Sequence, residues 1–556
     1  MSDPIAPFRE RYRKAVGDPQ LGRNLLGFQR AWGAARRAAF EHLQTKADLG
    51  VPEPSFAGQR ARLVEAKSLA LRDRARQFAR FKAAAEAAGA TVYESTSGQD
   101  AVRYIVDLCR RRHARVIAKG KSMVSEELFL NHGLQAAGVT VVETDLGEWI
   151  IQLARETPAH MVMPAIHKSR QQVGSLFETH IGRPVSREDI AEMAGVARQE
   201  LRRAFAEADV GITGANALIA ETGTVMLVTN EGNGRLTSSL PPVHIVLSGW
   251  EKLVPTFQDA ATQVRLLARS GTGQDITTYT TFITGPDRPD RELHIVIVDN
   301  GRSEMAADPA LSTVLSCIRC AACADVCPPY QVVGGQVFGF VYSGAVGLIN
   351  TAFHHDLDAA AGPQSLCVSC NACATVCPVG IPLPSLILDV RRRVAERVGL
   401  SLGKRLAIAV WSRPRLFSAL LGLARWAQTP FVNGAYLRVP LPGAFRWRTP
   451  PALARRPARA GLLGRELAPD QHGPLAESSA RGLTVTYFLQ CLSDRFAPEQ
   501  ATAAVAVLRA CGVRVVVPRD QHCCGLPALD LAMPGRRARW HARRSPRWTA
   551  RAPPGS

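Results

Sequence analysis

The sequence carries two copies of one cysteine pattern, Cys317-Ile-Arg-Cys320-Ala-Ala-Cys323-Ala-Asp-Val-Cys327-Pro328 and Cys367-Val-Ser-Cys370-Asn-Ala-Cys373-Ala-Thr-Val-Cys377-Pro378. In each copy three thiols stand close together on a short turn, and a fourth follows directly before a proline. Three thiols at this spacing reach three corners of one compact metal cluster, so the fourth ligand must come from elsewhere in the chain. Paired zinc sites and disulfides are the alternatives, but neither requires two identical four-Cys runs.

This spacing is typical of chains that bind two [4Fe–4S] clusters, in which the last Cys of each run binds the other cluster. We therefore expect two clusters with crossed ligands. The first set is Cys317, Cys320, Cys323 and Cys377, and the second set is Cys367, Cys370, Cys373 and Cys327. Two clusters held in this way lie close enough to exchange electrons.

Length and composition bound the class of protein. A chain of 556 residues is too long for one hydrophobic core. The 13 Cys, together with a start that lacks an apolar leader, predict a reducing compartment, the cytoplasm. The most apolar long stretch, 406–424, is interrupted by Ser412-Arg413-Pro414-Arg415, so no membrane span is expected.

The predicted fold class is α/β, with a mostly parallel sheet, joined to an α-helical domain for the two clusters and to a partial second α/β domain. We divide the chain into six segments. They are a helical lead-in (1–90), the α/β domain (91–300), the cluster domain (301–395), a basic Pro- and Arg-rich linker with amphipathic helices (396–480), the partial domain (481–530) and a basic tail (531–556). We interpret the tail as the aberrant end of a domain cut short, not as a nucleic-acid arm.

Short β-rich segments alternate with helical ones in the α/β domain, which predicts parallel strands at 115–118, 139–143, 161–163, 225–229, 243–247 and 293–299. Polar or Gly-rich clusters follow several of them. Because ligands of open α/β sheets bind at the carboxyl ends of strands, we expect one polar cleft for a small anion. Its candidate residues are Lys119, Lys121 and Arg235 for a carboxylate, and Glu221 as the proton acceptor. Each of these polar or Gly-rich groups of residues, taken alone, is also explained by the residue preferences of turns, without any ligand.

Two features suggest partners of other classes. Residues 187–203 read like a helix-turn-helix with Gly195 in the turn, but their place inside the α/β domain favours a packed helical pair, and we expect no nucleic acid.

The linker helices are flanked by basic residues, which makes the membrane surface a candidate peripheral contact; packing on a partner or on the cluster domain is the favoured alternative. These residues are Lys404, Arg405, Arg413, Arg415 and Arg425.

The segment 481–530 reads as a strand, a helix and a second strand, which would bring Cys491 and the vicinal Cys523-Cys524 pair to one sheet edge. No Cys follows Cys524, so this partial site has at most three thiols. A complete third cluster is therefore doubtful.

Residues from about 90 to 395 resemble the lactate utilization protein B family, the iron–sulfur component of a three-part L-lactate oxidation system. The motifs that carry the resemblance are Lys119-Gly-Lys-Ser-Met-Val-Ser-Glu-Glu127, Glu143-Thr-Asp-Leu-Gly-Glu148, Pro164-Ala-Ile-His-Lys168, Gly211-Ile-Thr-Gly-Ala-Asn216, Ala220-Glu-Thr-Gly-Thr224, Thr229-Asn-Glu-Gly-Asn-Gly-Arg235 and Glu251-Lys-Leu-Val-Pro255. The resemblance implies a lactate-utilization (LUD) domain, similar in fold to sugar-phosphate isomerases and coenzyme A transferases. Residues 481–530 resemble the first half of the Cys-Cys-Gly domain of the A component.

The resemblance implies an electron-transfer role in oxidising L-lactate or a related 2-hydroxy acid, with A-type and C-type proteins as partners and a quinone-type acceptor. No Gly-x-Gly-x-x-Gly fingerprint marks a hydride-carrying cofactor, so we expect a subunit of an oxidoreductase more than a complete enzyme. The alternatives are a non-catalytic scaffold around an electron relay, and the same relay serving glycolate or glycerol 3-phosphate. The expected location is the cytoplasm, with the inner membrane face as a candidate peripheral site.

Overall fold

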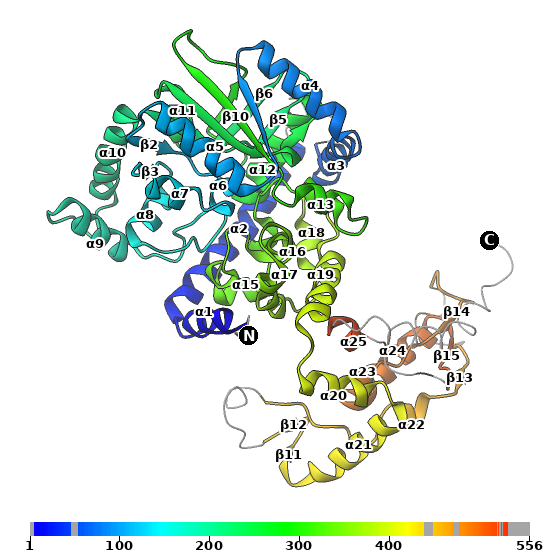
Figure 1. Cartoon of the computed structure of the whole chain (residues 1–556). Helices are drawn as coiled ribbons and strands as arrows, with labels where there is room; N and C mark the ends of the chain where they lie inside the picture. Colours follow the sequence, from blue (N-terminus) through cyan, green and yellow to red (C-terminus); the bar gives the residue numbers. More distant parts are fainter. Residues whose placement is uncertain are drawn as a thin grey trace. The chain divides into compact units, whose positions relative to one another are not determined.

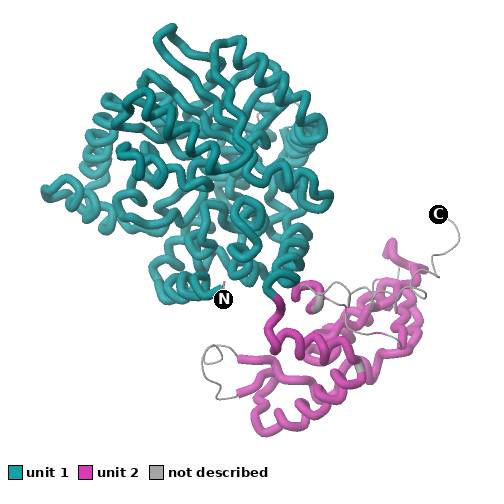
Figure 2. The backbone as a smooth tube through the Cα atoms, viewed as in Figure 1, with its two compact units in different colours: residues 1–398 teal, residues 399–556 magenta. Residues whose placement is uncertain are grey.

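The computed structural model describes residues 5–45, 54–438, 449–470 and 478–519, together with residues 475, 521, 524 and 526–531. The chain forms two compact units, residues 1–398 and 399–556, which Figure 2 shows in different colours. The predicted tail lies outside the described residues, apart from Leu531. Among the described helices none alone meets the length and apolarity of a membrane span, but Leu402–Trp411 and Arg415–Ala427 meet them together as a pair bent by 100°.

The N-terminal segment forms four helices, α1 (Ala6–Val16), α2 (Pro19–Thr45), α3 (Phe56–Arg72) and α4 (Arg74–Ala87). Leu21, Leu25 and Trp32 lie on one face of α2 at helical spacing and are buried. The Trp32 indole N–H donates to the Ser270 carbonyl at 3.1 Å. The lead-in is therefore part of the main core of the first unit.

The predicted mostly parallel sheet is confirmed. Its strand order is β1-β10-β7-β4-β2-β3, and every neighbouring pair is parallel. Figure 1 labels β2, β3 and β10 of this sheet. The strands are β1 (Thr91–Ser95), β2 (Val116–Lys119), β3 (Thr140–Glu143), β4 (Val210–Thr213), β7 (Val243–Gly249) and β10 (Glu292–Val298).

Both faces of this sheet are covered, which explains its apolar strands. Ile117 packs with Ile105 of α5 (Gly98–Arg111) in one apolar cluster, whereas its neighbour Ala118 packs with Trp149 of α8 (Leu146–Ala154) in another. Because successive side chains of a strand point to opposite faces, the two clusters lie on opposite sides of the sheet.

Two predicted strands differ from the structure. Val225–Thr229 belongs to β6 (Thr224–Thr229), which pairs antiparallel in a separate sheet with β5 (Ala217–Ile219) and β9 (Tyr279–Ile283); β8 (Leu253–Val254) completes that sheet. The strand predicted at 161–163 is wrong. The N–H groups of Val162 and Met163 both donate to Nδ1 of His160 at 3.0 Å, so they do not form a strand ladder.

The helical pair predicted within residues 187–203 is wrong, because one continuous helix, α10 (Ile190–Glu207), covers this segment. It pairs with the preceding helix, α9 (Arg170–Ile181). Gly195 lies inside α10, so the turn that a helix-turn-helix needs at this position is not there. Phe177 of α9 and Met193 of α10 are buried in one apolar cluster. The pair is thus a cover for the sheet edge.

The cysteine-rich segment is helical, as predicted. Its helices are α13 (Arg302–Ala307), α14 (Ala322–Asp325), α15 (Pro328–Val333), α16 (Gly344–His354), α17 (Leu357–Ala361), α18 (Ala372–Val376) and α19 (Leu383–Val398), with short 3-10 helices η3 (Ser312–Ser316), η4 (Gln336–Phe338) and η5 (Pro363–Leu366). Helix α16 is almost wholly buried and contacts α14, α17 and α19.

The second unit contains the two predicted linker helices, α20 (Leu402–Trp411) and α21 (Pro414–Ala427), and a hairpin of β11 (Val432–Asn433) and β12 (Tyr436–Leu437). Its second half holds the sheet β13-β15-β14. Strands β14 (Thr484–Thr486) and β15 (Arg514–Val516) are parallel, with α24 (Pro498–Ala510) between them in sequence. The remaining elements are α22 (Arg459–Leu462), β13 (Glu466–Leu467), α23 (Cys491–Arg495) and α25 (Leu526–Asp530).

A buried ion network joins the α/β segment to the cysteine-rich segment. Arg302 donates to both oxygens of Glu127, at 2.8 and 2.9 Å, and through Nε to Glu251 at 2.7 Å. The other Glu251 oxygen accepts from Arg319 at 3.5 Å, and the Tyr342 hydroxyl donates to Glu127 at 2.6 Å. All five side chains are buried. Burial alone would raise the pKa of Glu127, but the positive charge of Arg302 outweighs this effect and lowers the pKa to about 2.

We expect R302M to lower the free energy of unfolding by about 3–5 kcal/mol, because it removes the cation that two buried carboxylates share. The control is R112M, which removes the exposed partner of Glu292 and is expected to cost less than about 1 kcal/mol. Urea unfolding of the anaerobically purified full chain measures both. Equal midpoints for the two variants would contradict the stabilising role of the network.

Candidate functional site

The two cysteine runs fold with the same local backbone. A 3-10 helix precedes each run and a short helix, α14 or α18, lies within it. Four residues at equivalent places in the two runs have left-handed φ values of 61°, 66°, 54° and 64°: Arg319, Ala321, Ser369 and Asn371. This conformation is strained for residues other than Gly. It turns successive N–H groups to one side, and the Arg319 N–H donates to the Cys317 sulfur at 3.4 Å.

The structure brings the eight thiols together in two groups. Cys320 and Cys323 lie within electrostatic range of Cys317 and also of Cys377, from the other run. Cys373 and Cys327 likewise lie in range of Cys367 and Cys370. The groups are thus Cys317, Cys320, Cys323 and Cys377, and Cys327, Cys367, Cys370 and Cys373.

The donor set of each group fits a [4Fe–4S] cluster, which binds four thiolates. The second group lines a cavity whose other walls include the apolar side chains of Phe338, Leu348 and Ile387. Backbone N–H groups face the first group: burial raises the pKa of Cys320 and of Cys323, and the N–H groups of Ala322 and Val346 act against this rise. Such amide contacts to sulfur tune an iron–sulfur centre.

Burial controls the acidity of these thiols. It raises the pKa of Cys327 to about 11 and that of Cys373 to about 12. These groups therefore keep their protons at neutral pH until a metal displaces them. Among the described residues, no three His, Cys, Asp or Glu side chains converge closely enough to hold a single metal ion.

The two runs differ in exposure. Cys320, Cys323 and the residues between them are buried. In the second run Cys370 is exposed and Val368 is 62% exposed. One thiol group therefore lies inside the unit, and the other lies near its surface.

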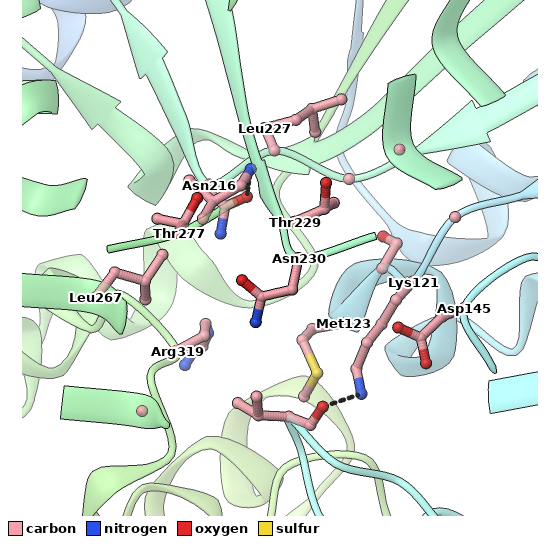
Figure 3. A pocket seen from close by; sticks show the side chains of 18 of the residues that line it. Lys121, Met123, Asp145, Asn216, Leu227, Thr229, Asn230, Leu267, Thr277 and Arg319 are labelled. Carbon is pink, nitrogen blue, oxygen red and sulfur yellow. Dashed lines mark hydrogen bonds between the residues drawn. The ribbon is translucent and has the colours of Figure 1, made fainter. Parts of the chain in front are cut away.

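A cavity of about 330 Å³ lies where polar loops follow the strands, as shown in Figure 3. It brings together several of the clusters from which we predicted a cleft: Gly120–Ser122, Asp145, Gly214–Asn216, Thr229–Glu231 and Asn233–Gly234. Met161–Met163, the segment wrongly predicted as a strand, forms part of its wall. Ile318, Arg319 and Cys320 form another part of the wall, so the first cysteine run borders the cavity directly.

The predicted cleft residues have different placements. Lys121 lines the cavity and contacts the Val162 carbonyl and Glu148, both at 3.2 Å. Lys119 is buried in ion pairs with Glu143 at 2.8 Å and Glu126 at 3.0 Å, so its ammonium is already occupied. These carboxylates raise the pKa of Lys119, against the effect of burial.

The other two candidates do not line the cavity. Glu221 accepts a hydrogen bond from the Phe257 N–H at the start of α12 (Phe257–Gly271). Arg235, in α11 (Asn233–Ser239), places its guanidinium over the ring of Tyr279 at 5.3 Å. Neither residue is among the described residues that line the cavity.

Sequence reasoning missed two cationic residues of the cavity, Lys252 and Arg319. Both are buried, and burial lowers the pKa of Lys252 to about 8. The one available signal for Lys252 was its place inside the motif Glu251-Lys-Leu-Val-Pro255, and for Arg319 its place between two cysteines. Neither pattern indicates that these two side chains, which come from different segments of the chain, lie in the wall of one cavity.

The partial cysteine site of the second unit is only partly described. Cys491, at the start of α23, and Cys524 are both exposed. Cys523 lies outside the described residues. A ligand set at this place stays a prediction.

Three family models match the chain: the LUD domain over residues 78–305, a 4Fe-4S dicluster domain over 313–381 and a cysteine-rich domain over 485–544. The chain is 37% identical to the uncharacterized electron transport protein YkgF of Escherichia coli, over 77% of this chain and 89% of that protein. It is 40% identical to lactate utilization protein B 2 of Bacillus mycoides (62% and 75% covered) and 41% identical to lactate utilization protein B of Bacillus licheniformis (62% and 74% covered).

We expect paired Cys→Ser variants to reveal which thiols share a cluster. C320S/C377S changes two thiols of one group and should retain about four of eight irons, because the other cluster keeps all its ligands. C320S/C327S changes one thiol in each group and should lose iron from both clusters. Anaerobic iron and sulfide quantitation measures the difference. If C320S/C377S instead loses both clusters and C320S/C327S only one, the crossed arrangement is wrong.

Proposed function

Because the chain belongs to the lactate utilization protein B family, we propose that it is the iron–sulfur component of an L-lactate oxidation complex and passes electrons towards a quinone-type acceptor. The expected pair of [4Fe–4S] clusters is confirmed by the dicluster match. When bound, each cluster accepts and releases one electron at a time. The chain's own role in this proposal is to hold the clusters, to shield one of them and to expose the other.

The observation that carries the proposal is the shared wall between the cavity and the first cysteine run. Cys320 lines the cavity, while Cys370 of the second run is exposed. We propose that each of the two thiol groups is the ligand set of one cluster. Electrons that arrive at the cavity side would then pass through the buried cluster to the exposed one, where a partner can take them up.

The exposed second run supports protein partners, and we propose the A-type and C-type lactate utilization proteins. The helix pair α20–α21 supports a further contact, with an anionic membrane surface, where quinones reside. Leu402, Leu406, Leu423 and Trp426 are 62–81% exposed on these helices. Residues 399–438 carry basic residues and not one Asp or Glu. Exposed apolar side chains next to basic ones are the features of an interfacial helix.

The first test combines anaerobic iron quantitation with EPR on the full chain mixed with its A-type and C-type partners. We expect about eight irons per chain and reduction of the clusters by L-lactate only when the partners are present. Glycolate and glycerol 3-phosphate serve as alternative donors. Faster reduction by either of these would assign the relay to another dehydrogenase, and iron-free folded protein would refute the electron-transfer role.

A variant pair separates a catalytic cleft from a scaffold. We expect K121M to lower partner-dependent lactate oxidation by about tenfold or more, the effect of losing a charged hydrogen bond to the substrate. E221Q is the matched control, because Glu221 does not line the cavity, and its activity should stay near that of the wild type. If K121M is as active as E221Q, the α/β domain acts as a scaffold.

A further inference from the structure

The cavity beside the first cysteine run contains a buried ammonium group that forms no direct hydrogen bond or ion pair with the residues that the structure describes. Lys252 lies in the 3-10 helix η2 (Trp250–Lys252), is 6% exposed and lines the cavity. Its Nζ makes no hydrogen bond or ion pair with any other residue that the structure describes, and the charges of Glu251 and Cys317 act on it only from a distance. Lys67, the nearby buried lysine, instead donates to the Glu251 and Leu253 carbonyls. A charged group taken from water without a partner is costly, so Lys252 calls for an anion in the cavity.

A second buried group of the cavity wall is also unsatisfied. The Asn233 side chain is 7% exposed, and its Oδ1 has no hydrogen-bond partner among the described residues. An amide oxygen accepts from a donor such as a hydroxyl, and the same amide turned by 180° presents its NH₂ group, which donates to an oxo oxygen. Lys252 and Asn233 together therefore suit a ligand with an anionic group and a short polar substituent.

The charged groups of the cavity favour an organic anion of modest size. Lys121, Lys252 and Arg319 are its cations, and Asp145 and Glu231 are its carboxylates. In Figure 3, Lys121 and Asp145 lie on one side of the cavity and Arg319 lies on the other, with Asn230 between them. Apolar side chains such as Met123, Leu227 and Leu267 complete the wall, which suits a carbon skeleton better than a bare inorganic ion.

We propose that this cavity binds a short 2-hydroxy or 2-oxo carboxylate, with Lys252 as the cation that holds the carboxylate, and that binding is linked to the charge of the first cluster. The proposal rests on the proposed function for the presence of that cluster. Cys320, a member of the first thiol group, lines the same cavity. The second thiol group lines a different one.

The linkage follows from like charges. An electron added to the first cluster repels the carboxylate, so the reduced protein binds it more weakly. For unit charges about 10 Å apart at an effective dielectric constant of about 20, the weakening is on the order of tenfold. By reciprocity the carboxylate makes the first cluster harder to reduce, by about 59 mV for a tenfold difference in affinity.

The test uses the anaerobically purified full chain with its clusters, and pyruvate as the probe. Calorimetry should show pyruvate binding to the oxidised protein, weakened at least tenfold in K252M and partly restored in K252R. The matched control is K82M, which changes an exposed lysine paired with Glu94, and it should bind like the wild type. Phosphate should compete poorly; equal competition would make this an inorganic-anion site and overturn the assignment.

A redox titration followed by EPR provides the second readout. Saturating pyruvate should lower the potential of one cluster by about 59 mV and leave the other unchanged. Unchanged potentials, or K252M that binds pyruvate as tightly as the wild type, would overturn the proposal. If K252M does not fold, the titration of the wild type still decides it. Pyruvate binding without partner-dependent lactate oxidation would refute the proposed function and leave this site standing. Missing iron would refute the proposed function and the linkage to the first cluster, and calorimetry would then decide the carboxylate site by itself.

Discussion

The contact of Arg302 with Glu127 and Glu251 is the interaction on which the first unit depends. A buried guanidinium between two buried carboxylates is stable only when the geometry is close and the remaining donors are satisfied. Three different segments supply these groups: α6 (Met123–Glu127), η2 and α13. The network leaves no space for a side chain at Gly249, where a Cβ would lie 1.9 Å from a Glu251 oxygen.

The same network positions the wall of the cavity. Glu251 contacts Arg319, which lies over the Tyr342 ring at 4.4 Å, and Tyr342 donates to Glu127. The first cysteine run is thereby attached to the α/β segment through Arg319, the residue directly before Cys320. The contact keeps the cavity and the first thiol group close together, and the electrostatic influence of one charge on another is stronger at short separation.

One cysteine motif serves two environments in this chain. The backbones of the two runs match, down to the left-handed residues Arg319 and Ser369. Their surroundings differ, because the buried helix α16 contacts α14 of the first run, while the second run leaves Val368 and Cys370 exposed. The motif specifies how thiols are presented to a cluster, and the neighbouring elements specify whether that cluster is shielded.

Local sequence patterns were sufficient for the two cysteine runs, for the strands β2, β3, β7 and β10 of the parallel sheet and for the polar loops after the strands, whereas β1 and β4 were not predicted. These features depend on residues close together in the chain: the turn between Cys317 and Cys323, the apolar run of β7 and the glycines around Gly214. The pattern at 161–163 misled for the same reason, since His160 takes the N–H groups that a strand would use. Boundaries and faces of elements depend on such competing contacts, which a pattern of residue types does not contain.

The sequence by itself determined the cofactor class, the family and the fold class, because thiol spacing and strand periodicity are local properties of the chain. The tertiary structure alone decided which charged groups are available. It paired Lys119 with Glu143 and left Lys252 facing the cavity, although the sequence marks both only as lysines next to apolar strands. It also placed Arg319, a residue of the cysteine run, against a cavity of the α/β segment. Contacts between residues far apart in the chain make these choices, since burial and pairing depend on where the whole chain brings each side chain.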